Sequence, residues 1–214
     1  GILDDKTATA HVDRRDMLRI LEETPETYAQ AYTAALKANT LPRALAHAPA
    51  HVALVGIGGS AIAADVIKDW LFESKTSIEV VRGSKLPGSI SKNTCALISS
   101  YSGETVETLE ALREARRRNS HVACIASEGT MIKTCKASRI PYVPVRKGLQ
   151  PRAALPYLFS ASLAMLVRWG ICNRRTARTE LKDATKALMT LRDAIGFNQP
   201  YAKNPAKQLA IQLM

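Results

Sequence analysis

Short apolar runs that alternate with helical stretches are the feature of this sequence that most constrains its fold. Runs of this kind, bounded by glycine, proline or polar residues, are typical of strands buried on both faces of a parallel sheet. The helical stretches between them, such as 61–72 and 104–118, supply the crossovers. We therefore predict an α/β fold with three αβα layers and right-handed crossovers. The five predicted parallel strands are 51–55, 77–81, 95–99, 122–126 and 142–145.

Helical segments flank the predicted sheet on both sides. Residues 1–48 carry apolar side chains at helical spacing and form a predicted N-terminal helical segment. The sheet and its helices form the predicted domain 49–196. Asn204 and Pro205 are the residue types that begin a helix, as N-cap and first helical residue. That helix has no stop signal, so we expect 197–214 to be a linker and the truncated first helix of a second domain.

The chain is basic, with a formal net charge of +11 at pH 7, but its basic residues are dispersed. The densest cluster, Arg116–Arg118, follows acids at helical spacing, and we interpret it as the solvated C-terminal end of a helix. The sequence has no basic segment interleaved with aromatic residues and no nucleic-acid-binding motif, so we predict no nucleic-acid partner. The positive charge suits the attraction of an anionic metabolite.

Neither a membrane span nor a secretion signal is predicted. The sequence lacks an apolar run of about 18 residues, the length a membrane helix needs. Its first residues include Asp4 and Asp5 and no apolar core, unlike a signal peptide. The four cysteines are widely spaced, with no Cys-x-x-Cys and no Cys/His pair at metal spacing. We therefore expect reduced thiols, a cytoplasmic location, no metal and no membrane partner.

Two strand-to-helix loops hold the candidate site, because ligands of parallel α/β sheets bind beyond the carboxyl ends of the strands. The first, which we call the glycine loop, is residues 56–61 (GIGGSA). Its glycines let the backbone approach a ligand, and the helix after it offers N–H groups to an anion. The loop also fits the dinucleotide fingerprint G-x-G-x-x-A. The second strand leads into Arg82 rather than an acid, which leaves an NADP-dependent enzyme as one alternative and a tight turn without a ligand as another.

The second loop, which we call the serine loop, is residues 100–105 (SYSGET). It places three hydroxyls, those of Ser100, Ser102 and Thr105, around a glycine at the start of a helix. Hydroxyls together with helix N–H groups make a phosphate cradle that needs no metal. The alternative, in which these residues only cap the helix, accounts well for one hydroxyl and poorly for three.

The motif Ser-Tyr-Ser-Gly-x-Thr-x-Glu-Thr after an apolar strand resembles the phosphate loop of SIS (sugar isomerase) domains, and the glycine loop resembles the same family. A third segment, 150–156 (QPRAALP), is similar to the bifunctional phosphoglucose/phosphomannose isomerases, as are Leu86-Pro87 and 204–210. The resemblance extends from about residue 15 to the C-terminus. It implies a flavodoxin-like SIS fold, with this chain as the first of two SIS domains and 197–214 as the start of the second.

The resemblance also implies roles for single residues. The substrate phosphate would be held by Ser100, Ser102 and Thr105, the sugar would lie along Gly58, Gly59 and Ser60, and Arg152 would be the catalytic residue beside C1 and C2. A fixed guanidinium suits stabilisation of an enediolate, because it stays charged and offers several donors. The family loop usually has asparagine where this sequence has Glu104, and a carboxylate beside a phosphate is unfavourable unless it points away.

The implied reaction is isomerisation of glucose 6-phosphate or mannose 6-phosphate to fructose 6-phosphate, without a cofactor. The family takes its catalytic base and a ring-opening histidine from the second SIS domain, in a homodimer, so this chain alone is expected to be inactive. The chain's own histidines match none of the catalytic positions, and two of them begin predicted strands. The four histidines are His11, His47, His51 and His121.

A different class of function, a non-catalytic SIS regulator that senses a sugar phosphate, is the alternative. Such regulators carry a DNA-binding helix-turn-helix, and the helices before residue 48 are the place for one in this chain. Those helices lack a recognition-helix pattern, and the acids Glu22, Glu23 and Glu26 argue against contact with DNA.

Overall fold

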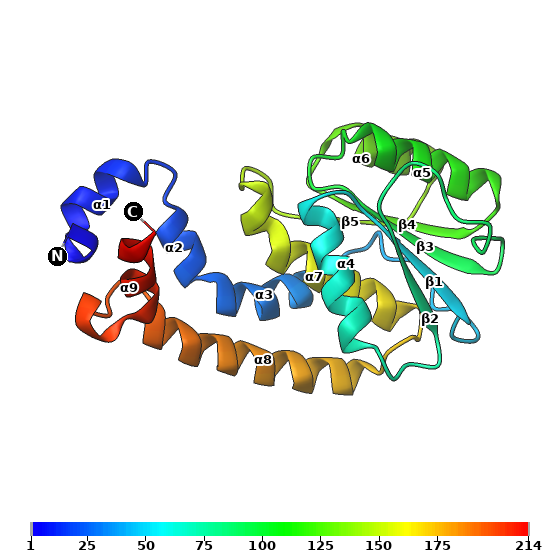
Figure 1. The fold of residues 1–214 in the computed structure, drawn as a ribbon. Coiled ribbons are helices and arrows are strands. Elements are labelled where there is room, and N and C mark those ends of the chain that lie inside the picture. Colours follow the sequence, from blue (N-terminus) through cyan, green and yellow to red (C-terminus); the bar gives the residue numbers. More distant parts are fainter. Residues whose placement is uncertain (1, 214) are drawn as a thin grey trace.

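The computed structural model describes residues 2–213, and its centre is one sheet of five parallel strands in the order β2-β1-β3-β4-β5 (Figure 1). The predicted α/β class is therefore confirmed. From β1 the chain moves outward to β2 and then returns to the other side of β1, so the switch point of the topology lies between β1 and β3. The strands are β1 (His51–Val55), β2 (Ser77–Val81), β3 (Thr94–Ser99), β4 (His121–Ala126) and β5 (Tyr142–Pro144).

Helices cover both faces of the sheet, as the predicted three layers require. Along β1, Val52 and Leu54 belong to one apolar cluster, whereas Ala53 and Val55 belong to a second cluster on the opposite face of the sheet. This alternation is the strand period of two, applied to a sheet buried on both sides. One face is covered by α3 (Thr24–Leu36), α4 (Gly59–Trp70) and α7 (Leu155–Arg168), and the other by α5 (Val106–Arg117) and α6 (Gly129–Ser138).

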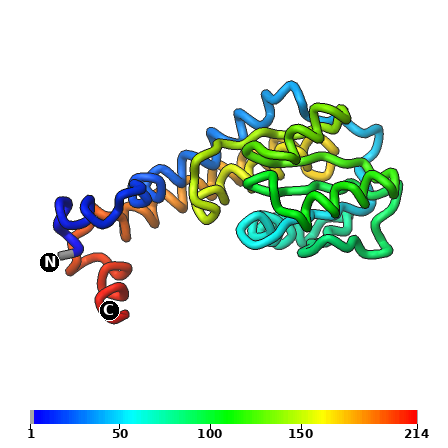
Figure 2. Tube along the Cα trace, turned by 90° about the horizontal axis from the view of Figure 1, so that it is seen from above, coloured from blue at the N-terminus to red at the C-terminus, as the bar shows by residue number. Residues whose placement is uncertain are grey.

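The remaining helices extend away from the sheet and make the molecule elongated (Figure 1 and Figure 2). The long helix α8 (Arg174–Ile195) packs along α3 and leads to the end of the molecule where both termini lie. There it contacts α9 (Pro205–Gln212) and the end of α2 (Met17–Glu22), and α1 (Lys6–Val12) lies at the same end of the molecule. The N-terminal helical segment and the C-terminal segment are thus neighbours in space. The predicted division of the chain at residues 48 and 196 stays a prediction.

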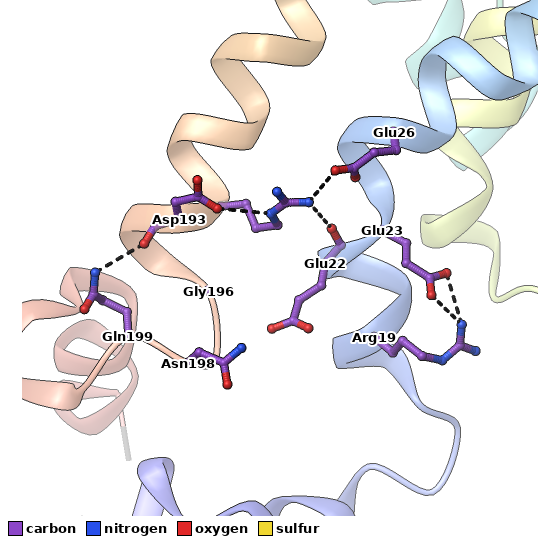
Figure 3. Close-up of a pocket in the computed structure, with 9 residues that line it drawn as sticks. Arg19, Glu22, Glu23, Glu26, Asp193, Gly196, Asn198 and Gln199 are labelled. Atoms are coloured by element: carbon purple, nitrogen blue, oxygen red, sulfur yellow. Dashed lines mark hydrogen bonds and ion pairs between the residues drawn. The ribbon is translucent and has the colours of Figure 1, made fainter.

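Arg192 bonds the C-terminal end of α8 to the N-terminal helices, beside a pocket of about 570 Å³ (Figure 3). Arg192 donates to Glu26 Oε1 at 2.7 Å and to the carbonyl oxygen of Glu22 at 3.1 Å. On the opposite wall, Arg19 donates to Glu23 at 2.8 and 3.0 Å. Because these pairs are partly exposed, each stabilises the arrangement modestly.

The predicted helix start at Asn204 is confirmed. The Asn204 side chain accepts a hydrogen bond from the N–H of Lys207 at 3.1 Å and caps α9. The Lys207 ammonium, almost fully buried, donates to Asp4 Oδ1 and to the carbonyl oxygen of Phe197, both at 2.7 Å. The first and last segments are therefore tied together by a charge-assisted pair in which the lysine is buried and the aspartate is partly exposed.

The cysteines and histidines of the strands and Arg118 at the end of α5 show how other side chains are placed. Cys95 and Cys124 are buried free thiols in β3 and β4, and His51 and His121 are the first residues of β1 and β4, as predicted for the two histidines. Arg118 departs from its predicted solvated state, because its guanidinium donates to the carbonyl oxygens of Leu86 at 2.9 Å and Ile90 at 3.1 Å. Across residues 2–213, no helix combines the length and apolar character that a membrane crossing requires.

Candidate functional site

The glycine loop joins β1 to α4 at the carboxyl edge of the sheet, and its backbone requires glycine. Gly58 has φ +54° and ψ −127°, a backbone conformation that glycine adopts readily and residues with a side chain rarely adopt. A Cβ on Gly56 would lie 3.0 Å from the carbonyl oxygen of Ser60, so the strand-to-helix turn closes only without a side chain there. The buried Ser60 hydroxyl accepts a hydrogen bond from the N–H of Tyr101 at 3.1 Å. The two candidate loops are therefore bonded to each other across the switch point.

The serine loop joins β3 to α5, and its hydroxyls bond within the loop. Ser100 Oγ donates to Thr105 Oγ1 at 3.1 Å and accepts from the N–H of Gly103 at 3.2 Å. Ser102 Oγ accepts from the N–H of Glu104 at 3.2 Å. Thr105 occupies the N-cap position of α5, but its side chain makes no capping hydrogen bond. Thr105 therefore does not cap α5 through its side chain, and within residues 2–213 the first turn of α5 keeps N–H groups without a side-chain acceptor.

The Glu104 carboxylate points out of the serine loop and binds the start of α6. It accepts hydrogen bonds from the N–H of Thr130 at 2.7 Å and from the Thr130 hydroxyl at 2.8 Å. These hydrogen bonds lower the pKa of Glu104 below its usual value, with a smaller contribution from Lys133. The negative charge is stabilised at a helix N-terminus. The carboxylate is therefore bonded to the start of α6 and not to the three hydroxyls of the serine loop.

Arg152 lies on a short 3-10 helix, η2 (Pro151–Ala154), and its side chain is exposed. A Cβ on Gly59 would come within 3.5 Å of the carbonyl oxygen of Pro151, so η2 lies against the start of α4. Ala154 is fully buried and anchors η2 to the core. Within residues 2–213, the Arg152 guanidinium makes no hydrogen bond or ion pair, so it is available to a ligand. The structure thus brings the segment of Arg152 next to the glycine loop.

A cleft of about 1030 Å³ opens beside the serine loop. Tyr101, Ser102 and Pro151 are among the residues that line it. The helix α6 adds Lys133 and Lys136 to the lining. Neither lysine is a predicted site residue, because α6 is not among the predicted helices. The spacing of Met131 and Cys135, both fully buried, was the available signal for that helix.

Arg82 is the residue whose position after the second strand left an NADP site as an alternative, and it is already bonded within the domain. Its guanidinium forms an ion pair with Asp65 of α4. A 2′-phosphate at this position would have to compete with that carboxylate. The geometry therefore favours an anion site in the serine loop over a dinucleotide site at the end of β2.

These features define the class of the protein as a doubly wound, three-layer α/β domain with a candidate anion site at its switch point. The chain belongs to the SIS domain family, whose family model matches residues 44–166. That segment includes the glycine loop, the serine loop and Arg152.

Similar proteins agree with this assignment. The bifunctional phosphoglucose/phosphomannose isomerase of Caldicellulosiruptor bescii is 31% identical over 76% of this chain and 48% of its own length. The D-glucosamine-6-phosphate 4-epimerase of Sulfolobus acidocaldarius is 28% identical over 54% of this chain and 37% of its own length. The crystal structure of tagatose-6-phosphate ketose/aldose isomerase from Escherichia coli shares the fold, with a TM-score of 0.60 and 16% identity over 84% of this chain and 53% of that one. The chain spans about half the length of the C. bescii relative.

Proposed function

We propose that this chain is the sugar-phosphate-binding N-terminal half of an isomerase that interconverts glucose 6-phosphate or mannose 6-phosphate with fructose 6-phosphate. The observation that carries the proposal is the meeting of three motifs at one edge of the sheet: the glycine loop, the serine loop and the segment of Arg152. Curated relatives with the name phosphoglucose/phosphomannose isomerase, at 31% and 33% identity, support the substrate class.

In this proposal the phosphate binds at the serine loop. The hydroxyls of Ser100, Ser102 and Thr105 turn from their bonds within the loop toward the phosphate oxygens, and the first turn of α5 adds N–H groups. A phosphate dianion also gains from the positive end of the α5 dipole. The site needs no metal or cofactor to hold its ligand.

The sugar then extends along Gly58, Gly59 and Ser60 toward Arg152. Isomerisation moves a proton between C1 and C2 through an enediolate, and the Arg152 guanidinium stabilises the negative charge that develops on its oxygens. A general base and an acid for ring opening are also required. We assign them to a second SIS domain beyond this chain, in a homodimer located in the cytoplasm.

The experiment that tests this proposal is calorimetric titration of fructose 6-phosphate into the chain, with fructose as control. We expect saturable binding that requires the phosphate and is lost in Ser102→Ala. If a form extended to the length of the relatives binds fructose 6-phosphate no better than fructose and isomerises neither sugar phosphate, the proposal is wrong.

A further inference from the structure

Tyr101 is the point at which the loops around the candidate site meet. Its N–H donates to the hydroxyl of Ser60 in the glycine loop, at 3.1 Å. Its carbonyl oxygen accepts from both the N–H of Ser127 at 2.9 Å and the hydroxyl of Ser127 at 2.6 Å, after β4. Its phenolic oxygen accepts from the N–H of Leu149 at 2.8 Å and donates to the carbonyl oxygen of Arg146 at 3.1 Å. One residue of the serine loop therefore bonds three other loops.

The bonds of the phenolic oxygen matter most for Arg152, because they hold the turn that lies just before η2. They close both ends of the turn 146–149, which connects β5 to η2. On its other side η2 is held by the buried Ala154 at the start of α7. Arg152 lies between these two anchors, and within residues 2–213 its own side chain has no bonding partner that would fix it. Its backbone is therefore held on one side by Ala154 and by the packing of Pro151 against Gly59, and on the other side by the turn that Tyr101 bonds.

We propose that Tyr101 is a positioning residue, which holds Arg152 at a fixed distance from the phosphate-binding hydroxyls of its own loop. This inference rests on the proposed function. A sugar phosphate has a fixed length between its phosphate and its C1–C2 end, so both ends are recognised only if the two binding groups are kept at the matching separation. Tyr101 supplies that link, since its backbone belongs to the serine loop and its side chain bonds the segment before Arg152.

Two ligands separate this role from a merely structural one. Inorganic phosphate reports on the serine loop alone. 5-Phosphoarabinonate, a sugar-acid phosphate whose carboxylate imitates the enediolate, reports on the serine loop and Arg152 together. In Tyr101→Phe we expect the affinity for inorganic phosphate to stay within about twofold, and the affinity for 5-phosphoarabinonate to fall about tenfold. Tyr142→Phe is the matched control, because Tyr142 lines the same cleft and its hydroxyl makes no hydrogen bond within residues 2–213.

A double-mutant cycle with Arg152→Ala then tests whether Tyr101 acts through Arg152. If it does, Tyr101→Phe lowers the affinity for 5-phosphoarabinonate in the wild-type background and leaves it unchanged when Arg152 is already alanine. Equal losses for both ligands, or an equal loss with and without Arg152, would overturn the inference while leaving the proposed function in place. Should neither ligand bind to the chain, nor to a form extended to the length of its relatives, both proposals fail together.

Discussion

At the scale of single residues, Gly103 shows how strictly backbone geometry fixes the serine loop. Its φ is +71°, and a Cβ would lie 1.9 Å from the carbonyl oxygen of Glu128. We expect Gly103→Ala to lower the free energy of unfolding by about 3 kcal/mol or more, because left-handed strain adds to a clash with a main-chain atom. Gly170→Ala is the control, since its φ of +78° is similar but the space around it is open. Urea unfolding that gives equal losses would show that the clash has no effect.

Glu104 gives a prediction for the dependence of stability on pH. Hydrogen bonds from Thr130 lower its pKa from the ordinary 4.5, so its contribution to stability is complete above that pH and is lost as the pH falls through the lowered value. We expect wild type to melt at a higher temperature than Glu104→Gln at neutral pH, and this difference to shrink steadily below pH 4.5. Scanning calorimetry across this range measures it. Glu110→Gln, which changes an exposed side chain of α5 away from this contact, is the matched control.

The same residues show what the sequence alone can and cannot predict about the site. The hydroxyls and glycines were identified because their spacing belongs to a local strand-to-helix turn, which a short motif specifies. The direction of Glu104 depends on α6, and the bonds of Tyr101 depend on the turn 146–149, so neither follows from local spacing. Arg118 was misjudged for the same reason, because its carbonyl partners belong to a loop about 30 residues earlier in the chain.

At the scale of secondary-structure elements, the predicted strands agree with the structure to within one residue at every end, because short β-rich runs between polar breaks leave little choice of where a strand begins and ends. The helix α6 was not predicted. It has ten residues, begins at Gly129, a poor helix former, and buries only Met131 and Cys135, so its apolar periodicity is weak. Its packing against the second core cluster stabilises a segment whose local signals are poor.

The N-cap of α9 is an element-scale feature with a measurable effect. Asn204 is fully buried, and besides capping α9 it donates to the carbonyl oxygens of Ile195 at 3.0 Å and Gly196 at 2.9 Å. We expect Asn204→Ala to lower the free energy of unfolding by about 2 to 3 kcal/mol, since the cap is lost together with two partly buried hydrogen bonds to main-chain carbonyl oxygens. Asn173→Ala, which removes only the exposed cap of α8, should cost about 1 kcal/mol. Chemical denaturation compares them, and equal losses would mean that the buried carbonyl bonds contribute nothing.

At the scale of the whole molecule, the net charge of +11 should act on an anionic ligand over distances longer than any contact. Lys136 lies at the cleft beside the serine loop, whereas Lys186 is exposed on α8, away from the site. Raising the salt concentration from about 20 mM to about 200 mM shortens the screening length to less than 10 Å, so the affinity for fructose 6-phosphate should fall several-fold.

The two lysines separate local attraction from a general effect of charge. Lys136→Gln should reduce both the affinity for fructose 6-phosphate at low salt and its salt dependence, because it removes a charge near the phosphate. Lys186→Gln removes the same charge at a distance where screening is strong, and should change the affinity little. Calorimetric titrations of both variants at two salt concentrations decide the matter. If the two substitutions have equal effects, the attraction depends on net charge alone, and the lysines that α6 places at the cleft have no special part in bringing the ligand to the serine loop.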